Sequence, residues 1–427
     1  MRKSLLPAIA LIAIPATLAA QEIAPPPAAA PAPAAEPGMP DPAAVVLALD
    51  SHPSVEAARA RTGAAEAEAR ALARGPHELT FSGSYLRRSV DREGSYNEFD
   101  GQLTRALRLP GKARLDREIG RFGIDAATNL TEDTRHQAAL LLNEGWWDWL
   151  GAAEQARVDR QAVANYTMLL KATKRRVGLR DAAQLDADQA EAQLGTAKLA
   201  AQQSAGREAI ARARLVAQFP GLPLGDSPPP VPTPRLPEQD ITALGALVVE
   251  RSHEIAAAEA RAAQAGAGSA RARAERIADP SLGVRMFSER GGAERGVGVL
   301  FSMPFGGGYR KAQAEQAEAQ ASAAQADLTA TRFAVDEMAQ GDITGVRYAL
   351  TAWQAAREGL NAQIAALEKL RLGLKAGEID LADELLGERQ VHDAFRAEAQ
   401  ARTEAMRALT KLRIDSHTIW VTPSDEH

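Results

Sequence analysis

The sequence predicts a mainly α-helical protein that also contains β-hairpins and is built from two repeats. Three observations predict this fold class. Only 4% of the residues are aromatic while Ala is the commonest residue, which suits helices packed at close range. No Pro occurs from Gly111 to Phe219 or from Phe305 to Thr422. The order of sequence features in the first half recurs in the second half, which indicates an internal repeat.

The N-terminus predicts export. Arg2 and Lys3 precede an apolar run and residues 1–20 end in small residues, as in a secretory signal peptide. A membrane anchor is the alternative, but the run is short for a membrane span. Residues 21–42 are rich in Pro and Ala and form a predicted extended leader.

A Pro-rich linker at 220–238 divides the remaining chain into a first repeat at 43–219 and a second at 239–420, followed by a tail at 421–427. Matching features include a Ser-His pair that opens a helical stretch and a Pro/Gly-rich turn. These features are Ser51-His52 and Ser252-His253, and Leu109-Pro110-Gly111 and Met303-Pro304-Phe305.

The two Pro-free stretches predict very long helical hairpins. Both are rich in helix-forming residues, and Ala and Leu recur at spacings of three, four and seven, which is typical of a helix-packing seam. If the hairpins turn at Gly178 and Gly377, each longer arm has about 65 to 70 residues and reaches roughly 100 Å. Such a stripe can also mark the core of a soluble helical bundle, which is the alternative interpretation.

The segments before the two Pro/Gly turns alternate between apolar or small residues and polar residues, which is the period of a β-strand. We expect one hairpin within residues 77–108 and another within 280–304. Strands of roughly ten residues match the length of a tilted strand that crosses a membrane. A small sheet that faces water is the alternative.

Four strands in one chain cannot close a membrane barrel, and an open sheet edge in lipid leaves backbone groups unpaired. Several chains must therefore share the barrel if the strands enter a membrane. Two copies would give an eight-stranded barrel filled by side chains, and three would give an open twelve-stranded barrel.

This combination of features resembles the TolC family of outer-membrane efflux proteins over nearly all of the chain after the leader. Four short motifs carry the local resemblance. They are His52-Pro53-Ser54-Val55 at a helix start, Leu107-Arg108-Leu109-Pro110-Gly111-Lys112-Ala113-Arg114 at a strand-to-helix turn similar to that of the cation-efflux branch, Val177-Gly178-Leu179 at one helical tip, and Ala376-Gly377 at the other.

The resemblance implies a homotrimer with a twelve-stranded barrel in the outer-membrane lipid and a helical barrel in the periplasm. It implies two further partners, a periplasmic adaptor protein and an inner-membrane pump of the resistance-nodulation-division type. Such a channel conducts solutes passively, without a cofactor. The likeness around Lys112 favours metal cations over drugs as cargo.

The resemblance also assigns candidate site residues. Val177, Gly178 and Leu179 in one tip and Ala376 and Gly377 in the other would dock the adaptor. Asp383 and its neighbour Glu384 would form a ring of carboxylates at the periplasmic entrance of the trimer. Here the chain departs from the family pattern, because Ile379, Leu386 and Gln184 occupy positions where other members place charged residues. Ordinary solvated helix residues are the alternative interpretation of Asp383 and Glu384.

Other chemistries find little support. The chain has no Cys, which excludes thiol chemistry and an acylated N-terminal Cys. The seven His residues are scattered, so we expect no metal site and assign them to helix starts or exposed positions. No nucleophile-elbow or phosphate-loop motif is present, so we expect a non-enzyme. A formal net charge of -5 argues against a nucleic-acid partner.

Two questions stay open at this stage. The cluster Trp146, Trp147 and Trp149 points in several directions on a helix, so we expect at least one of these side chains to face a neighbouring chain or the equator of the assembly, with core packing as the alternative. A periplasmic coiled-coil adaptor or scaffold protein would share the long hairpins without needing strands that face lipid. It is therefore the alternative function.

Overall fold

The computed structural model describes residues 36–237 and 239–421. The predicted signal peptide, most of the predicted leader and all but the first residue of the predicted tail lie outside these residues.

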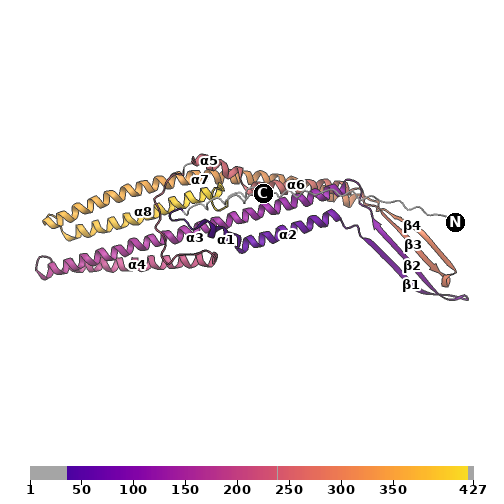
Figure 1. Cartoon of the computed structure of the whole chain (residues 1–427), viewed down its shortest axis with the longest axis horizontal. Coiled ribbons are helices and arrows are strands. Elements are labelled where there is room, and N and C mark those ends of the chain that lie inside the picture. Colours follow the sequence, from indigo (N-terminus) through magenta and orange to yellow (C-terminus); the bar gives the residue numbers. More distant parts are fainter. Residues whose placement is uncertain (1–35, 238, 422–427) are drawn as a thin grey trace, which may run out of the picture. The chain divides into compact units, whose positions relative to one another are not determined.

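The described chain is mostly helical, and its elements occur in the same order in both halves (Figure 1). The first half contains α1 (Pro42–Asp50), α2 (Pro53–Arg74), β1 (Leu79–Val90), β2 (Gly94–Ala106), α3 (Lys112–Gly178) and α4 (Gln184–Gln218). The second half contains α5 (Ile241–Glu250), α6 (His253–Glu275), β3 (Ser281–Glu289), a short 3-10 turn η1 (Arg290–Gly292), β4 (Glu294–Ser302), α7 (Gly308–Ala376) and α8 (Leu381–Asp415).

The two longest helices confirm the predicted arms of the hairpins. Helix α3 has 67 residues and α7 has 69, so each is about 100 Å long at 1.5 Å per residue. Helix α3 packs against α4 and α7 packs against α8, and α3 also contacts α2 and α6 (Figure 1). The core is therefore spread along the helices.

The Ser-His pair lies at a helix start in both halves, but a different side chain of the pair caps the helix in each half. His52 caps α2 by accepting a hydrogen bond at Nδ1 from the Ser54 N–H at 3.3 Å. In the second half Ser252 is the cap, and its Oγ accepts from the Ile255 N–H at 3.2 Å. Each cap satisfies one of the backbone donors left unpaired at a helix start.

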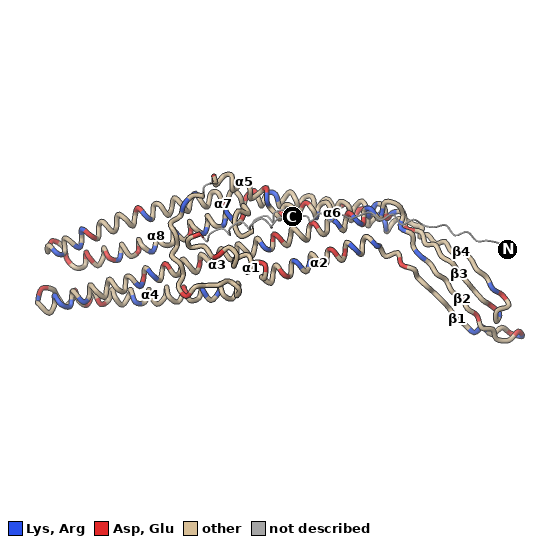
Figure 2. The backbone as a smooth tube through the Cα atoms, in the orientation of Figure 1, with Lys and Arg blue, Asp and Glu red and all other residues tan. Residues whose placement is uncertain are grey.

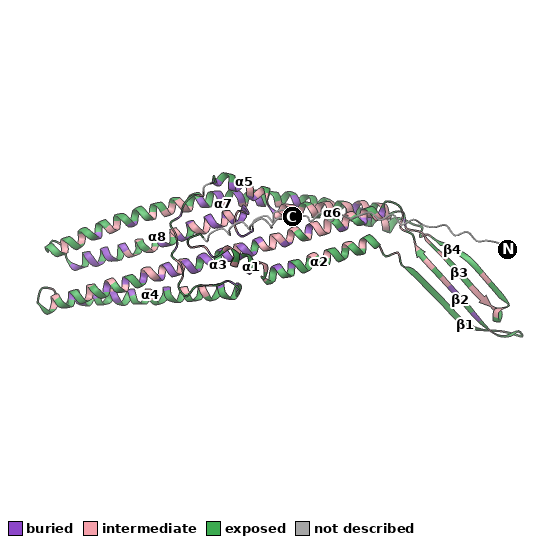
Figure 3. Cartoon of the chain, in the orientation of Figure 1, coloured by how far each residue is buried: buried purple, intermediate pink, exposed green. Residues whose placement is uncertain are grey.

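The two predicted hairpins are confirmed, and they join into one antiparallel sheet. The strand order is β1-β2-β3-β4, so β2 of the first half pairs directly with β3 of the second half. Because the connection between β2 and β3 runs through two long helices and the Pro-rich segment, this pairing joins the two halves. Most strand residues are exposed in the single chain (Figure 3).

The largest buried cluster surrounds the three Trp residues of α3. Trp146, Trp147 and Trp149 are all buried within this chain. The Trp147 Nε1–H donates to Thr410 Oγ1 of α8 at 3.2 Å, and the Trp146 Nε1–H donates to the Gly38 carbonyl at 2.9 Å. The expectation that one of these rings faces a neighbouring chain is wrong, because α1, α8 and the segment before α1 cover them.

Acidic and basic side chains are interspersed along the long helices (Figure 2). Several of them form ion pairs between helices, such as Arg396 of α8 with Asp159 of α3 at 2.6 Å. Among the described residues, no helix combines the length and the apolar character that a membrane span requires.

Candidate functional site

In the middle of the four-stranded sheet, one face is apolar across all four strands. Directly opposed residues form rows across all four strands, and their side chains share a face because successive residues of a strand alternate. Val299 is 82% exposed, so the described chain leaves this face uncovered. Two adjacent rows are Phe81, Leu103, Val284 and Val299, and Gly83, Gly101, Met286 and Val297.

The opposite face of the sheet is more polar and contains small residues. Arg285 of β3 forms an ion pair with Asp100 of β2 on this face. A sheet with one apolar and one polar face separates two environments, as the wall of a transmembrane barrel does. Two rows of this face are Ser82, Gln102, Arg285 and Gly298, and Ser84, Asp100, Phe287 and Gly296.

The sheet has two open edges. Within the described residues, β1 pairs only with β2 and β4 pairs only with β3. An unpaired backbone group in lipid costs several kcal/mol, so a sheet of this kind enters a membrane only if other strands cover its edges. Strands from other copies of the chain can do this, because the edges β1 and β4 lie at opposite sides of the same sheet.

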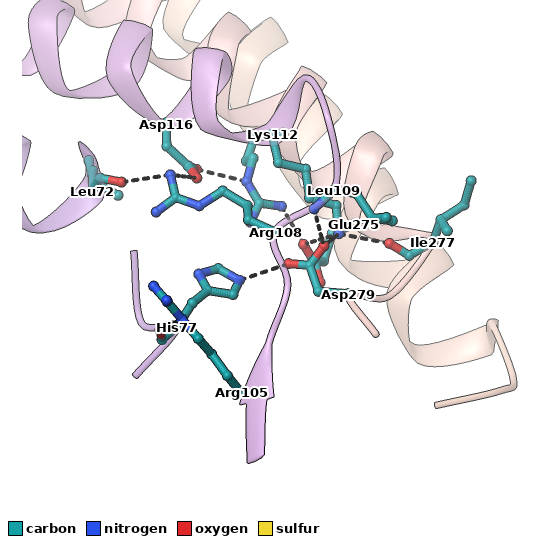
Figure 4. A network of polar contacts seen from close by, with 11 residues as sticks. Leu72, His77, Arg105, Arg108, Leu109, Lys112, Asp116, Glu275, Ile277 and Asp279 are labelled. Carbon is teal, nitrogen blue, oxygen red and sulfur yellow. Dashed lines mark hydrogen bonds and ion pairs between the residues drawn. The ribbon is translucent and has the colours of Figure 1, made fainter. Parts of the chain in front are cut away.

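A buried Lys holds the roots of the strands against α3. Lys112 is 2% exposed, and its Nζ lies 2.8 Å from Asp279 Oδ1, 2.8 Å from the Ile277 carbonyl and 3.0 Å from Glu275 Oε2 (Figure 4). Sequence reasoning linked Lys112 only to a family motif. In the structure Lys112 is the first residue of α3, and its side chain contacts the segment just before β3.

Asp279 is the centre of these contacts. Its Oδ1 also accepts the Leu109 N–H at 2.9 Å, and its Oδ2 lies 3.1 Å from His77 Nε2, just before β1 (Figure 4). Burial acts to raise the pKa of Asp279, but the hydrogen bonds from Lys112, Leu109 and His77 outweigh it and lower the pKa below its ordinary value. A single carboxylate therefore ties both hairpins to the start of α3.

A second carboxylate extends this arrangement. Asp116 of α3 lies 3.2 Å from Arg108 Nη1 and 2.7 Å from Arg271 Nε of α6. We call Arg108, Lys112, Asp116, Arg271, Glu275 and Asp279 the root network. Its members come from both halves of the chain, so it joins the two halves where the strands begin.

The tip between α3 and α4 presents an apolar side chain. Val177 and Gly178 are the last residues of α3, and Leu179 follows with 74% of its surface exposed. The left-handed residue of this turn is Arg180, with φ 61°, whereas Gly178 is still helical. Arg176 stabilises the turn through an ion pair with Asp181 at 3.1 Å.

The tip between α7 and α8 turns at Gly377, as the sequence predicted. Ala376 ends α7, and Gly377 caps it in the left-handed conformation with φ 76°, which favours Gly. Asp380 then caps α8, and its Oδ1 accepts the Asp383 N–H at 3.1 Å. Figure 1 shows both tips at the end of the helices opposite to the strands.

The two predicted entrance carboxylates differ in their surroundings. The side chain of Asp383 is exposed, whereas Glu384 is buried against α7 with Arg371 Nε 3.9 Å away. Burial and then the nearby charge of Glu388 raise the pKa of Glu384. Because Glu384 faces the partner helix of its own hairpin, only Asp383 of this pair remains available to a neighbouring chain or a solute path.

The prediction that the His residues lie at helix starts or exposed positions is wrong for four of the six described ones. The side chains of His77 and His392 lie away from helix starts and are only 11% and 14% exposed. His136 and His417 are each 3% exposed. His136 also lies beside Asp133 and Glu254, which sequence reasoning missed because Glu254 belongs to a different helix. The only local signal was the spacing of Asp133 and His136, which places them one helical turn apart.

Comparisons with known proteins find similar solved structures. No protein-family model and no curated protein matches the sequence. The outer membrane protein VceC from Vibrio cholerae matches with a TM-score of 0.74 at 16% identity, over 90% of this chain and 96% of that one. A membrane protein from Pseudomonas aeruginosa matches with a TM-score of 0.72 at 20% identity, over 90% and 91%. The MtrE outer membrane channel of Neisseria gonorrhoeae, solved in an open state, matches with a TM-score of 0.65 at 20% identity, over 88% of each chain.

These likenesses cover nearly the whole of the described chain and of the matched proteins. The described chain therefore has the fold of a single chain of these outer-membrane proteins. This confirms the expected combination of long helical hairpins with strand hairpins.

Proposed function

We propose that this protein is the outer-membrane channel of a tripartite efflux system, and that it conducts exported solutes passively and catalyses no reaction. The observation that carries the proposal is the sheet, whose apolar face runs across all four strands and ends in two open edges. The fold that the chain shares with outer-membrane channels supports the same conclusion.

Three copies fit this role better than two. Edge β4 of one chain would pair with edge β1 of the next, so three four-stranded sheets would close a twelve-stranded barrel. An eight-stranded barrel from two copies would be filled by its own side chains and could not conduct. In the trimer the face with Asp100 and Arg285 would line the pore and the face with Val299 would contact lipid.

We place the barrel in the outer membrane and the helices in the periplasm. Helices of 67 and 69 residues reach far from the strands, and the hairpin tips lie at their other end. There the tips would meet a periplasmic adaptor and, through it, an inner-membrane pump of the resistance-nodulation-division type. Metal cations or drugs are the proposed cargo. The matching element order supports repeat bounds at 43–219 and 239–420.

The first test is the size and conductance of the purified protein. Extracted in detergent, the protein is expected to form particles of three chains, because only closed edges are stable in lipid. The same particles should conduct ions across a planar lipid bilayer. Mass measurement in detergent and single-channel recording check both expectations.

A scaffold or adaptor protein would behave differently. It would stay in solution without detergent, because it would have no face that requires lipid. A soluble monomer with no channel activity would therefore overturn the channel proposal in favour of the alternative function.

The tips provide a second test. Replacing Leu179 with Asp should leave the fold and the membrane fraction unchanged, because this side chain is 74% exposed. Efflux should nevertheless fall at least tenfold if the tip packs against the adaptor, since a charge in an apolar contact is costly. Leu236→Asp in the Pro-rich segment is the matched control, because Leu236 is also exposed. Equal efflux by both variants would remove this tip from the docking surface.

The entrance provides a third test. Threefold symmetry would turn Asp383 into a ring of three carboxylates that attracts cations. Asp383→Asn should therefore reduce cation selectivity in single-channel recordings, by about twofold or more in the permeability ratio, as fixed charge in a constriction controls ion entry. Glu384→Gln is the control, because Glu384 faces Arg371 and should leave selectivity unchanged. Unchanged selectivity in Asp383→Asn would place Asp383 away from the pore.

A further inference from the structure

Three side chains that can bind metal meet between the two halves of the chain, away from the strands and the tips. Asp133 and His136 lie one turn apart on α3, and Glu254 lies in the first turn of α6. One ligand atom from each residue lies within 4.8 Å of those of the other two. Carboxylate oxygen and imidazole nitrogen are ordinary ligands of divalent transition metals.

The imidazole of His136 is held with one nitrogen facing this cluster. His136 is 3% exposed, and its Nε2 lies 2.7 Å from Oδ1 of the fully buried Asp415 of α8. With Nε2 directed at Asp415, the other ring nitrogen, Nδ1, is the one that points toward the cluster. A carboxylate behind a His in this way is typical of metal-binding His residues.

Nδ1 of His136 faces the two carboxylates. It lies 4.0 Å from Glu254 Oε1 and makes no hydrogen bond within the described part of the chain. Glu254 uses its other oxygen, Oε2, to accept from Ser252 Oγ at 2.7 Å. Both the imidazole nitrogen and Glu254 Oε1 are therefore available on the same side.

The two carboxylates lack a compensating cation. Between residues 36 and 421, apart from residue 238, neither Asp133 nor Glu254 forms an ion pair with Lys or Arg, and the hydrogen bond of Asp133 comes from Gln137 at 3.4 Å. Two carboxylates in this position repel each other unless a proton or a metal ion lies between them.

The two carboxylates of this cluster line a cavity that is large enough to hold water. It has a volume of about 370 Å³, and both carboxylates line it together with residues of α3, α6 and α7. Because one water molecule takes up about 30 Å³ of liquid, the cavity can admit a hydrated ion. Arg261 also lines the cavity without forming an ion pair to either carboxylate within the described residues.

We propose that Asp133, His136 and Glu254 bind a divalent transition-metal ion of the Zn²⁺ type, with water as the fourth ligand. Ligands of tetrahedral zinc lie about 3.3 Å apart for bonds of about 2.0 to 2.1 Å. Each carboxylate therefore needs to move inward by about 1 Å, which rotation of its side chain allows. The ion would join the first half to the second half through α3 and α6, with α8 supporting the His. It would be a resident structural ion, distinct from any cargo.

The test is binding of Zn²⁺ to tag-free, metal-stripped protein in detergent, measured by calorimetry together with the thermal unfolding temperature. One ion per chain should bind, and its binding should raise the unfolding temperature. Asp133→Asn and Glu254→Gln should each weaken binding at least tenfold and abolish the temperature rise. These variants are preferred because His136→Gln changes a buried residue and can impair folding. The control His52→Gln removes an imidazole from the corresponding helix start of the first half and should bind as the wild type does.

X-ray absorption of the zinc-loaded protein gives an independent readout. It should show one imidazole among nitrogen and oxygen ligands near 2.0 to 2.1 Å, and affinity should fall with acidification because the ligands must be deprotonated. The proposal is overturned if the wild type fails to bind Zn²⁺ at micromolar concentration, if both carboxylate variants bind like wild type, or if the ion has no imidazole ligand.

Discussion

Replacing Val299 with Arg is expected to prevent assembly in the outer membrane. Val299 lies in the apolar row of the sheet opposite Val284 and is 82% exposed in the single chain. If this face contacts lipid, an Arg near the bilayer midplane costs roughly 2–4 kcal/mol per chain. The proposed trimer contains three copies of the substitution, so it incurs this cost three times. Membrane fractionation and the yield of trimer in detergent would measure the loss.

Gly298→Arg is the matched control. Gly298 is the adjacent residue of the same strand, so its side chain points to the opposite face at nearly the same depth. A Cβ atom at Gly298 would meet no atom within 4 Å in the single chain, so the backbone accepts a side chain there without displacing a neighbour. We expect this variant to assemble. The reverse result, with Gly298→Arg lost and Val299→Arg assembled, would mean that the apolar face does not contact lipid.

Replacing Lys112 with Met is expected to destabilise the protein by about 3 kcal/mol, because it removes the buried cation that the mostly covered carboxylate of Asp279 contacts. Lys112 is 2% exposed and contacts both Asp279 and Glu275. Met keeps much of the apolar stem, so most of the loss should come from the missing charge. The thermal unfolding temperature by circular dichroism in detergent measures it.

Lys311→Met is the control, because Lys311 occupies the corresponding first turn of α7 but is 66% exposed. It should change stability little, as exposed ion pairs contribute little. The effect of Lys112→Met should also shrink in acid. Since the pKa of Asp279 is lowered in the folded protein, its contribution is present above its ordinary pKa and is lost as pH falls through the lowered value. An equal effect of the two substitutions would contradict the role of Lys112.

Local sequence patterns predicted most of the elements. The absence of Pro from residues 111–219 and 305–422 limited where the long helices could be interrupted, and the Gly residues near 178 and 377 marked their ends. Period-two alternation marked both hairpins, because one face of each strand must be apolar to contact lipid or a core. Each of these patterns depends only on residues that are near each other in the chain, so a single sequence is enough to recognise it.

The contacts that hold the elements together could not be predicted in the same way. Lys112 and Asp279 belong to opposite halves of the chain, and nothing near Lys112 in the sequence distinguishes it from the exposed Lys311. The direction of a helical side chain also depends on which helix packs beside it. That is why Glu384 was grouped with Asp383, although it is buried against Arg371.

Turn geometry shows a similar limit. The first hairpin was expected to turn at Gly178, but the helix continues through this residue, and the left-handed residue of the turn is Arg180. In this turn the backbone N–H groups of Arg180 and Asp181 donate to the carbonyls of Val177 and Arg176, both at 2.9 Å, which satisfies carbonyls left unpaired at the end of α3. His136 was similarly misjudged, since its burial depends on Asp415 of α8.

The two open edges of the sheet have a consequence for cells that carry two versions of the gene. In the proposed ring, each chain contributes one edge to each of its two neighbours, so a chain with a defective β1 or β4 leaves an unsealed gap in an otherwise normal barrel. The fraction of sound rings then falls as the cube of the fraction of sound chains. A mutant defective only at an edge would therefore be dominant over the normal copy, whereas a mutant that never folds would be recessive.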